Sequence, residues 1–149
     1  MISGGVISRA AMWPKDSYNN PGAGLVVESS RKGPDATVVV DGVEFSSNRL
    51  KDLQLSKGAI NCLVKNNSFT NIVTMRPFQR GGHVVRSNVF SGDAKVVLSK
   101  ASADNMPVTI KDNVYECVKD KFIKRRHGRL PENGVEQSVI VDNNSRKVG

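Results

Sequence analysis

A six-residue motif recurs along this chain and limits the folds that it can adopt. Its six positions are, in order, a β-branched residue, a polar residue, a small turn-forming residue, a residue that is usually Asn, any residue and an aromatic residue. Its full copies are 40–45, 64–69, 85–90 and 110–115. The steps between their first residues are 24 (40 to 64), 21 (64 to 85) and 25 (85 to 110). A period of this length is typical of a solenoid.

Two weaker copies extend the repeat towards both ends of the chain. The copy at 141–145 lacks the aromatic and follows a longer step of 31 residues (110 to 141), and a worn copy occupies 2–7. Further short β-type segments lie between the copies, at 25–27, 53–55, 72–75, 95–98 and 122–124. No segment keeps a 3.6-residue period, so little helix is expected.

These observations predict an all-β chain that forms a single β-helix domain over residues 1–149. Each coil would contribute two or three short strands, and about five or six coils would stack as parallel strands roughly 4.8 Å apart. One repeat phase would hold a ladder of asparagines at a tight corner, where Asn tolerates left-handed backbone geometry and can bond its neighbours. Another phase would hold stacked aromatics. Both sets are interpreted as structural; they are Asn67, Asn88, Asn113 and Asn144, and Phe45, Phe69, Phe90 and Tyr115.

The repeat resembles the right-handed parallel β-helix of pectin-lyase-like proteins, through its Val-x-x-Asn-x-Phe rungs between residue 2 and about residue 145. That superfamily includes pectate lyases, polygalacturonases and phage tailspikes. The resemblance implies a right-handed β-helix and one of two roles. One is an enzyme that binds polysaccharide along an outer groove, and the other is a virion spike or capsid-associated protein, often trimeric. The enzymes usually have more coils than this chain has repeats, which favours the second role.

Charge and cysteine content limit the partners further. The net charge is +8 and the pI is about 9.8, which favours an acidic glycan, nucleic acid or an acidic protein surface as partner. Cys62 and Cys117 fall in different repeat phases, so we expect two buried or half-buried free thiols and neither a disulfide framework nor a metal site. We find no signal peptide and no apolar run of the about 18 residues that a membrane span needs.

The candidate binding residues lie in two insertions that interrupt the period, at about 9–24 and 124–137. Insertions in solenoids form loops, often on the binding face. The first contains Trp13 and Tyr18, which suit a platform for sugars or an interface anchor, although Trp13 could instead fold back over the first coil. The second contains a basic run suited to carboxylate, sulfate or phosphate, or else serves as a solubilising loop. This run includes Lys124, Arg125, Arg126, His127 and Arg129.

Catalytic candidates are few. Asp112 and Asp142 form the best carboxylate pair for glycoside hydrolysis, but alternating charges at this phase are more simply a solvated edge. His83 is expected to be a half-exposed strand residue. No acidic cluster suggests a metal, and no cofactor is expected.

The sequence therefore favours a non-enzymatic virion structural β-helix, such as a phage tailspike segment or a capsid-decorating protein. It would assemble in the host cytoplasm as a homotrimer, without membrane contact, and bind an acidic surface polysaccharide or other virion proteins. The alternative is a polysaccharide lyase or glycoside hydrolase of the pectin-lyase-like group. Nucleic acid is a weaker candidate because few aromatics accompany the basic run.

Overall fold

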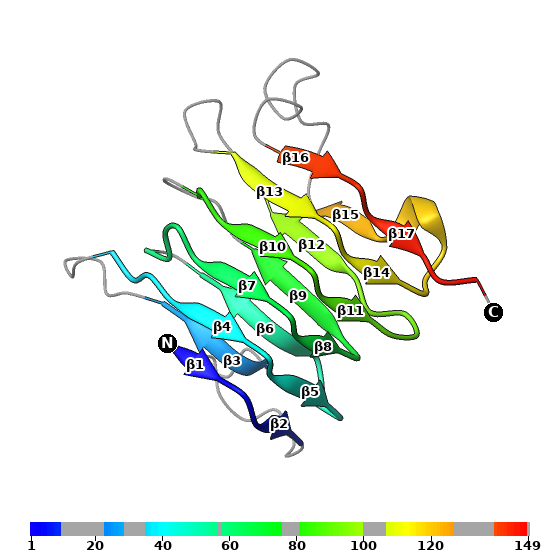
Figure 1. Ribbon diagram of the computed structural model, residues 1–149. Coiled ribbons are helices and arrows are strands. Elements are labelled where there is room, and N and C mark those ends of the chain that lie inside the picture. The colour runs from blue at the N-terminus through cyan, green and yellow to red at the C-terminus, as the bar shows by residue number, and fades with distance from the viewer. Residues whose placement is uncertain are drawn as a thin grey trace.

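The chain forms three parallel β-sheets whose strands stack coil upon coil (Figure 1). The computed structural model describes residues 1–9, 23–28, 35–56, 58–75, 81–99, 107–126 and 139–148. Sheet A consists of β1 (Ile2–Ser3), β4 (Val39–Asp41), β7 (Leu63–Lys65), β10 (Val84–Arg86), β13 (Val108–Lys111) and β16 (Val139–Asp142). Sheet B consists of β2 (Val6–Ser8), β5 (Glu44–Ser46), β8 (Ser68–Phe69), β11 (Val89–Phe90), β14 (Val114–Tyr115) and β17 (Ser145–Arg146). Sheet C consists of β3 (Ala23–Val27), β6 (Lys51–Leu55), β9 (Ile72–Met75), β12 (Val96–Ser99) and β15 (Ile123–Arg126).

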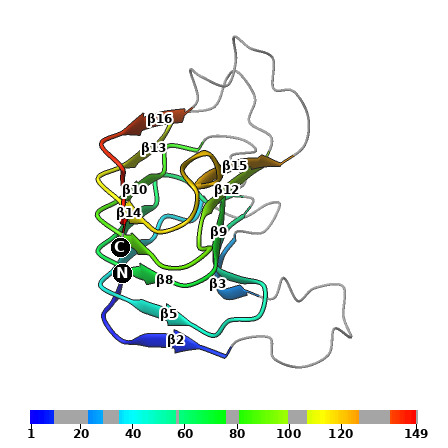
Figure 2. The ribbon, with the colours of Figure 1, turned by 90° about the vertical axis from the view of Figure 1, so that its right-hand side faces the viewer.

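The strand order shows how the chain travels. It passes through sheets A, B and C in turn, and each new strand pairs in parallel with the equivalent strand of the preceding coil. Figure 2 shows the result side-on, with β2 at the bottom and β16 at the top. The predicted all-β class is confirmed, and the arrangement is compatible with a parallel β-helix. Within the described residues the helical content is one 3₁₀ turn, η1 (Lys119–Lys121), and no helix there is long and apolar enough to cross a membrane.

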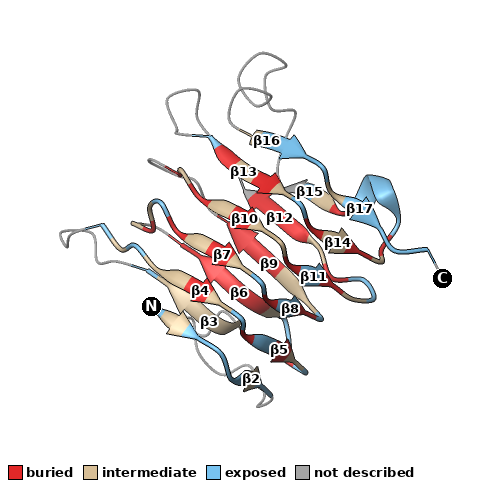
Figure 3. Cartoon of the chain, in the orientation of Figure 1, coloured by how far each residue is buried: buried red, intermediate tan, exposed pale blue. Residues whose placement is uncertain are grey.

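The core consists of side-chain columns that run up the stack. The repeat's first residues, Val40, Val64, Val85 and Ile110, are all fully buried. They stack because residues in register on parallel strands project to the same side. Figure 3 shows this burial along the middle strands, whereas β16 and β17 at the end of the stack are mostly exposed.

The aromatic column is also present. Ring centroids of Phe45 and Phe69 lie 4.9 Å apart, and those of Phe69 and Phe90 lie 5.1 Å apart. Phe122 then joins the column, 5.0 Å from Phe90 and stacked on Tyr115 at 4.3 Å. These contacts confirm that the repeated aromatics fill the core.

The asparagine ladder is confirmed as a chain of hydrogen bonds that is buried from Asn67 to Asn113 and partly buried at Asn144. The Oδ1 atom of Asn88 accepts from the backbone N–H and from Nδ2 of Asn67, at 2.9 and 3.0 Å. Asn113 does the same for Asn88, and Asn144 does so for Asn113. Each rung therefore satisfies backbone donors that the turn leaves without a strand partner.

The expected left-handed backbone lies one residue earlier than the ladder. Positive φ angles occur at Asn66 (58°), Ser87 (56°), Asp112 (55°) and Asn143 (50°). The turn needs a left-handed residue and a hydrogen-bonding amide side chain, and two adjacent residues supply them. One residue reverses the chain, and the next provides the amide of the ladder.

Candidate functional site

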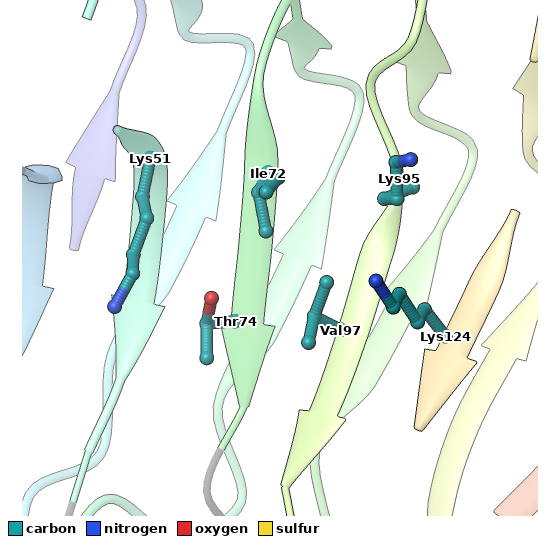
Figure 4. Close-up of a pocket in the computed structure, with 6 residues that line it drawn as sticks. All are labelled: Lys51, Ile72, Thr74, Lys95, Val97 and Lys124. Atoms are coloured by element: carbon teal, nitrogen blue, oxygen red, sulfur yellow. The ribbon is translucent and has the colours of Figure 1, made fainter. Parts of the chain in front are cut away.

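A lysine-lined groove lies on the outer face of sheet C (Figure 4). Its volume is about 90 Å³, and its lining comes from β6, β9, β15 and β12 with the residue that precedes β12. The lining residues are Lys51, Ile72, Thr74, Lys95, Val97 and Lys124. The groove is much smaller than the roughly 300–1,000 Å³ of a typical small-molecule pocket. It therefore suits part of an extended ligand that lies along the surface.

Strand register places these residues on the outside. Val73 and Val96 pair with each other and are fully buried in the core. The residues that follow them, Thr74 and Val97, also pair, and they project to the opposite face because side chains alternate along a strand. Lys124 pairs with Val97 one coil further on. Thr74 and Val97 are buried, at 2% and 5% exposure, and form the floor of the groove.

The three lysines surround this floor. Lys51 is in register with Ile72, and the Val73 N–H donates to the carbonyl of Lys95. Lys51 and Lys95 therefore lie two coils apart, about 10 Å along the stack. Lys51 Nζ donates to Gln54 Oε1 at 2.6 Å, which directs its ammonium along the strand towards the level of Thr74 (Figure 4). Lys51 and Lys95 are half-buried, and Lys124 is exposed.

The groove combines charge, a hydroxyl and an aliphatic surface. The lysine ammonium groups are point charges that suit carboxylate or sulfate. Thr74 supplies a hydroxyl, and Ile72 and Val97 supply apolar contact. None of the six lining residues is Asp, Glu or His. The lining therefore lacks the paired carboxylates that glycoside hydrolysis normally requires.

The structure brings one of the predicted binding residues to this groove. Lys124 lies in it, whereas Arg125 and Arg126 lie on β15. The β-type segment expected at 122–124 extends further than predicted, because strand pairing continues from Leu98 and Ser99 to Arg125 and Arg126, where a loop was expected. The other candidates, Trp13, Tyr18, His127 and Arg129, lie outside the described residues. Most of both predicted insertions lies outside them too.

Sequence reasoning missed Lys51 and Lys95. Neither belongs to the recurring motif or to an insertion, and neither lies in a continuous run of basic residues. The sequence could have indicated them only through their equivalent positions at the start of the second strand in each repeat. Aligning Lys51, Ile72 and Lys95 requires allowance for an irregularity between Lys51 and Leu53, which shifts the register of β6 against β9.

The carboxylate pair considered for hydrolysis lies elsewhere. Asp142 is in register with Lys111 on sheet A, and Asp112 follows Lys111 in the turn. Asp112 Oδ1 accepts a hydrogen bond from Asn143 Nδ2 at 2.8 Å, and both carboxylates are exposed. Neither aspartate lines the lysine groove. Across the described part of the chain, no group of three or more His, Cys, Asp or Glu side chains is placed to hold a metal ion.

His83 is fully buried, so its expected half-exposed position is wrong. It lies two residues before Val85 and therefore projects to the same inward side. Its Nδ1 accepts the Cys62 N–H at 3.2 Å, which leaves the proton of the neutral ring on Nε2. Nε2 has no hydrogen-bond partner among the described residues. Burial lowers the pKa of His83 to about 4, so the ring is neutral at pH 7.

Both cysteines are buried free thiols, as predicted. Burial raises the pKa of Cys62 and is also the main cause of the raised pKa of Cys117. The reactive thiolate is therefore disfavoured at both positions. These cysteines are core residues and do not form part of the groove.

Comparison with models of known protein families, with curated proteins and with solved structures finds no match to this chain.

Proposed function

We propose that this chain is a non-enzymatic binding module, folded as a right-handed parallel β-helix, that binds an acidic polysaccharide through the lysine groove of sheet C. The observation that supports this proposal is the composition of the groove. Three lysines surround an aliphatic and hydroxyl floor, and no carboxylate lies in the lining. A saccharide with acidic groups offers a counterpart for each part of this surface.

The ligand chemistry follows from the three kinds of contact. Carboxylate or sulfate groups would bind the lysine ammonium groups, and sugar hydroxyls would bond Thr74. The C–H faces of the sugar would pack on Ile72 and Val97. Nucleic acid fits this groove less well, because none of the lining residues is aromatic and could stack on a base.

A binding assay with matched variants tests the proposal. Polygalacturonate and a sulfated polysaccharide would serve as ligands, with dextran as the neutral control. We expect the double variant Lys95→Gln/Lys124→Gln to bind the acidic polymers about tenfold more weakly, since it loses two of the three charges. The control Lys119→Gln/Lys121→Gln loses the same charge at exposed positions outside the lining and should retain its affinity.

Two results would contradict the proposal. Equal losses in both double variants would show a general attraction to positive charge, without a defined groove. Release of reducing ends or of unsaturated products from either polymer would instead support the enzymatic alternative.

The virion setting and the homotrimer extend this proposal from the sequence resemblance alone. Sedimentation of the purified chain tests the trimer directly. A single monomeric species at micromolar concentration would contradict it.

A further inference from the structure

The outer face of sheet A carries a column of three cations on consecutive coils. Arg86 is in register with Lys65 on one side and with Lys111 on the other, so the three lie at intervals of about 4.8 Å. Like charges directly opposite each other on neighbouring strands destabilise a sheet. Local rules are most often broken at functional sites, so this column is a candidate binding surface.

Pairing within the protein relieves only part of this repulsion. Lys65 Nζ lies 3.5 Å from Asp41 Oδ2, at the lower end of the column. Arg86 and Lys111 have no ion pair with any residue that the structure describes. Asp142 is in register with Lys111 at the upper end, but their charged groups do not lie within ion-pair distance. The upper two cations therefore remain available to an external anion.

A second column on the same face is aliphatic. Val39, Leu63 and Val84 are in register with one another and partly exposed, and they project outward because the next residue of each strand is buried. The column continues through Thr109 to Ile140, which is 49% exposed. Leu63, Val84 and Thr109 precede Lys65, Arg86 and Lys111 by two positions, whereas Val39 and Ile140 precede Asp41 and Asp142 at the two ends. The two columns therefore run side by side up the stack, about 7 Å apart.

We propose that this face docks an acidic amphipathic α-helix of a partner protein, with the helix axis along the stack. Such a helix presents an apolar stripe beside an acidic stripe, and each stripe recurs about every 5.4 Å turn. Across the two steps from Lys65 to Lys111, this repeat differs from that of the coils by about 1 Å, which the flexible side chains of lysine and arginine absorb. A helix is about 10–12 Å wide and covers both columns.

Other acidic ligands match the face less well. An extended strand along the stack would present one side chain to this face about every 6.8 Å, so it would be out of step by about 4 Å after two coils. An acidic polysaccharide would account for the cations but would leave the aliphatic column without a defined role. The helix is the ligand that uses both columns at their observed spacing.

A synthetic peptide provides the test. It would be an acidic amphipathic helix in which one Leu and one Glu recur every three or four residues on adjacent faces, and its binding to the full chain would be followed by fluorescence anisotropy. We expect Arg86→Glu/Lys111→Glu to weaken binding at least about tenfold, because it replaces attraction by repulsion. A peptide with Lys in place of each Glu should bind this variant and not the parent protein. Val84→Ser should weaken binding of the original peptide by removing apolar contact.

Matched controls separate this surface from the groove on sheet C. Lys119→Glu/Lys121→Glu changes the net charge by the same amount at exposed positions off the face, and should leave peptide affinity within about twofold. Lys95→Gln/Lys124→Gln should also leave it unchanged, so failure of the proposed glycan function would not affect this result.

Four outcomes would overturn the inference. They are no binding of the peptide, equal weakening by the Lys119/Lys121 control, failure of the charge-exchanged peptide to bind the reversed protein, and self-association of the free chain through Val84 and Arg86. Displacement of the peptide from the Arg86 surface by polygalacturonate would instead assign the face to a polysaccharide. Circular dichroism of each variant would check that the fold is retained.

Discussion

Replacing Asn88 by alanine should show how much a buried rung of the asparagine ladder contributes to stability. The side chain makes four hydrogen bonds. Its Oδ1 accepts two from Asn67, and its Nδ2 donates to the Val64 carbonyl at 3.0 Å and to Asn113 Oδ1 at 3.1 Å. Alanine removes all four and leaves the buried N–H of Asn67 without an acceptor.

The magnitude follows from the number of bonds and from the orphaned donor. A hydrogen bond contributes about 1 kcal/mol net, and a buried donor without a partner costs about 1–3 kcal/mol. Some partners of Asn88 keep a second bond, since Asn67 Nδ2 also donates to the Val40 carbonyl. We therefore expect Asn88→Ala to lower the free energy of unfolding by about 4 kcal/mol. With an m-value of about 2 kcal/mol/M, the urea midpoint should fall by about 2 M.

Asn144→Ala provides the matched control at the last described rung. Asn144 makes the equivalent bonds to Asn113 and donates to the Ile110 carbonyl at 2.9 Å, but it is only partly buried. Water can replace these bonds, so we expect a loss of about 1 kcal/mol. Urea unfolding followed by far-UV circular dichroism compares the two variants. Asn144 makes three bonds and Asn88 makes four, so the number of bonds alone predicts a difference of about 1 kcal/mol. A difference no larger than this would refute the argument that burial sets the contribution.

Three further predictions concern the turn and the core. Stability should fall by about 3 kcal/mol between pH 6.5 and pH 4, because the unfolded chain binds a proton that buried His83, with a pKa of about 4, does not accept. Urea unfolding across this range should show a smaller slope for His83→Asn than for the parent. Phe90→Ala should cost about 3–5 kcal/mol because it opens a cavity between Phe69 and Phe122, and thermal unfolding would measure it. Ser87→Val should cost about 1–2 kcal/mol at a φ of 56°, and a Ser87→Gly variant as stable as Ser87→Val would contradict that reason.

The repeat predicted the core of the fold because it has one physical cause. Each coil must place an aliphatic residue, an asparagine and an aromatic residue at the same height as those of the coil below, so these types recur in the sequence. Val64, Asn67 and Phe69 are therefore visible as a motif. The left-handed residue was harder to place, because the structure uses Asn66, Ser87 and Asp112 there, and these types share little except tolerance of the turn.

The candidate site was less visible because no core constraint repeats on the outer faces. Lys51, Ile72 and Lys95 lie in one outward column but share no residue type, and the register of β6 against β9 shifts between Lys51 and Leu53. The position of His83 was predicted wrongly because its residue type was given more weight than strand alternation. Its type suggests exposure, but its distance of two residues from buried Val85 requires an inward side chain.

Alternation is therefore the better guide to function in this chain. The motif identifies the buried residue of each strand, and its neighbours on the strand must then project outward. The residue types at these outward positions, followed from coil to coil, give the composition of the outer surface. On sheet A these outward residues form a mainly aliphatic column and a column that includes three consecutive cations. On sheet C it gives lysines around an aliphatic floor. Because the coils repeat at about 4.8 Å, each column also specifies the spacing that a ligand must match. We therefore propose different ligands for the two faces, a flexible acidic polymer at the groove and a regular acidic helix on sheet A.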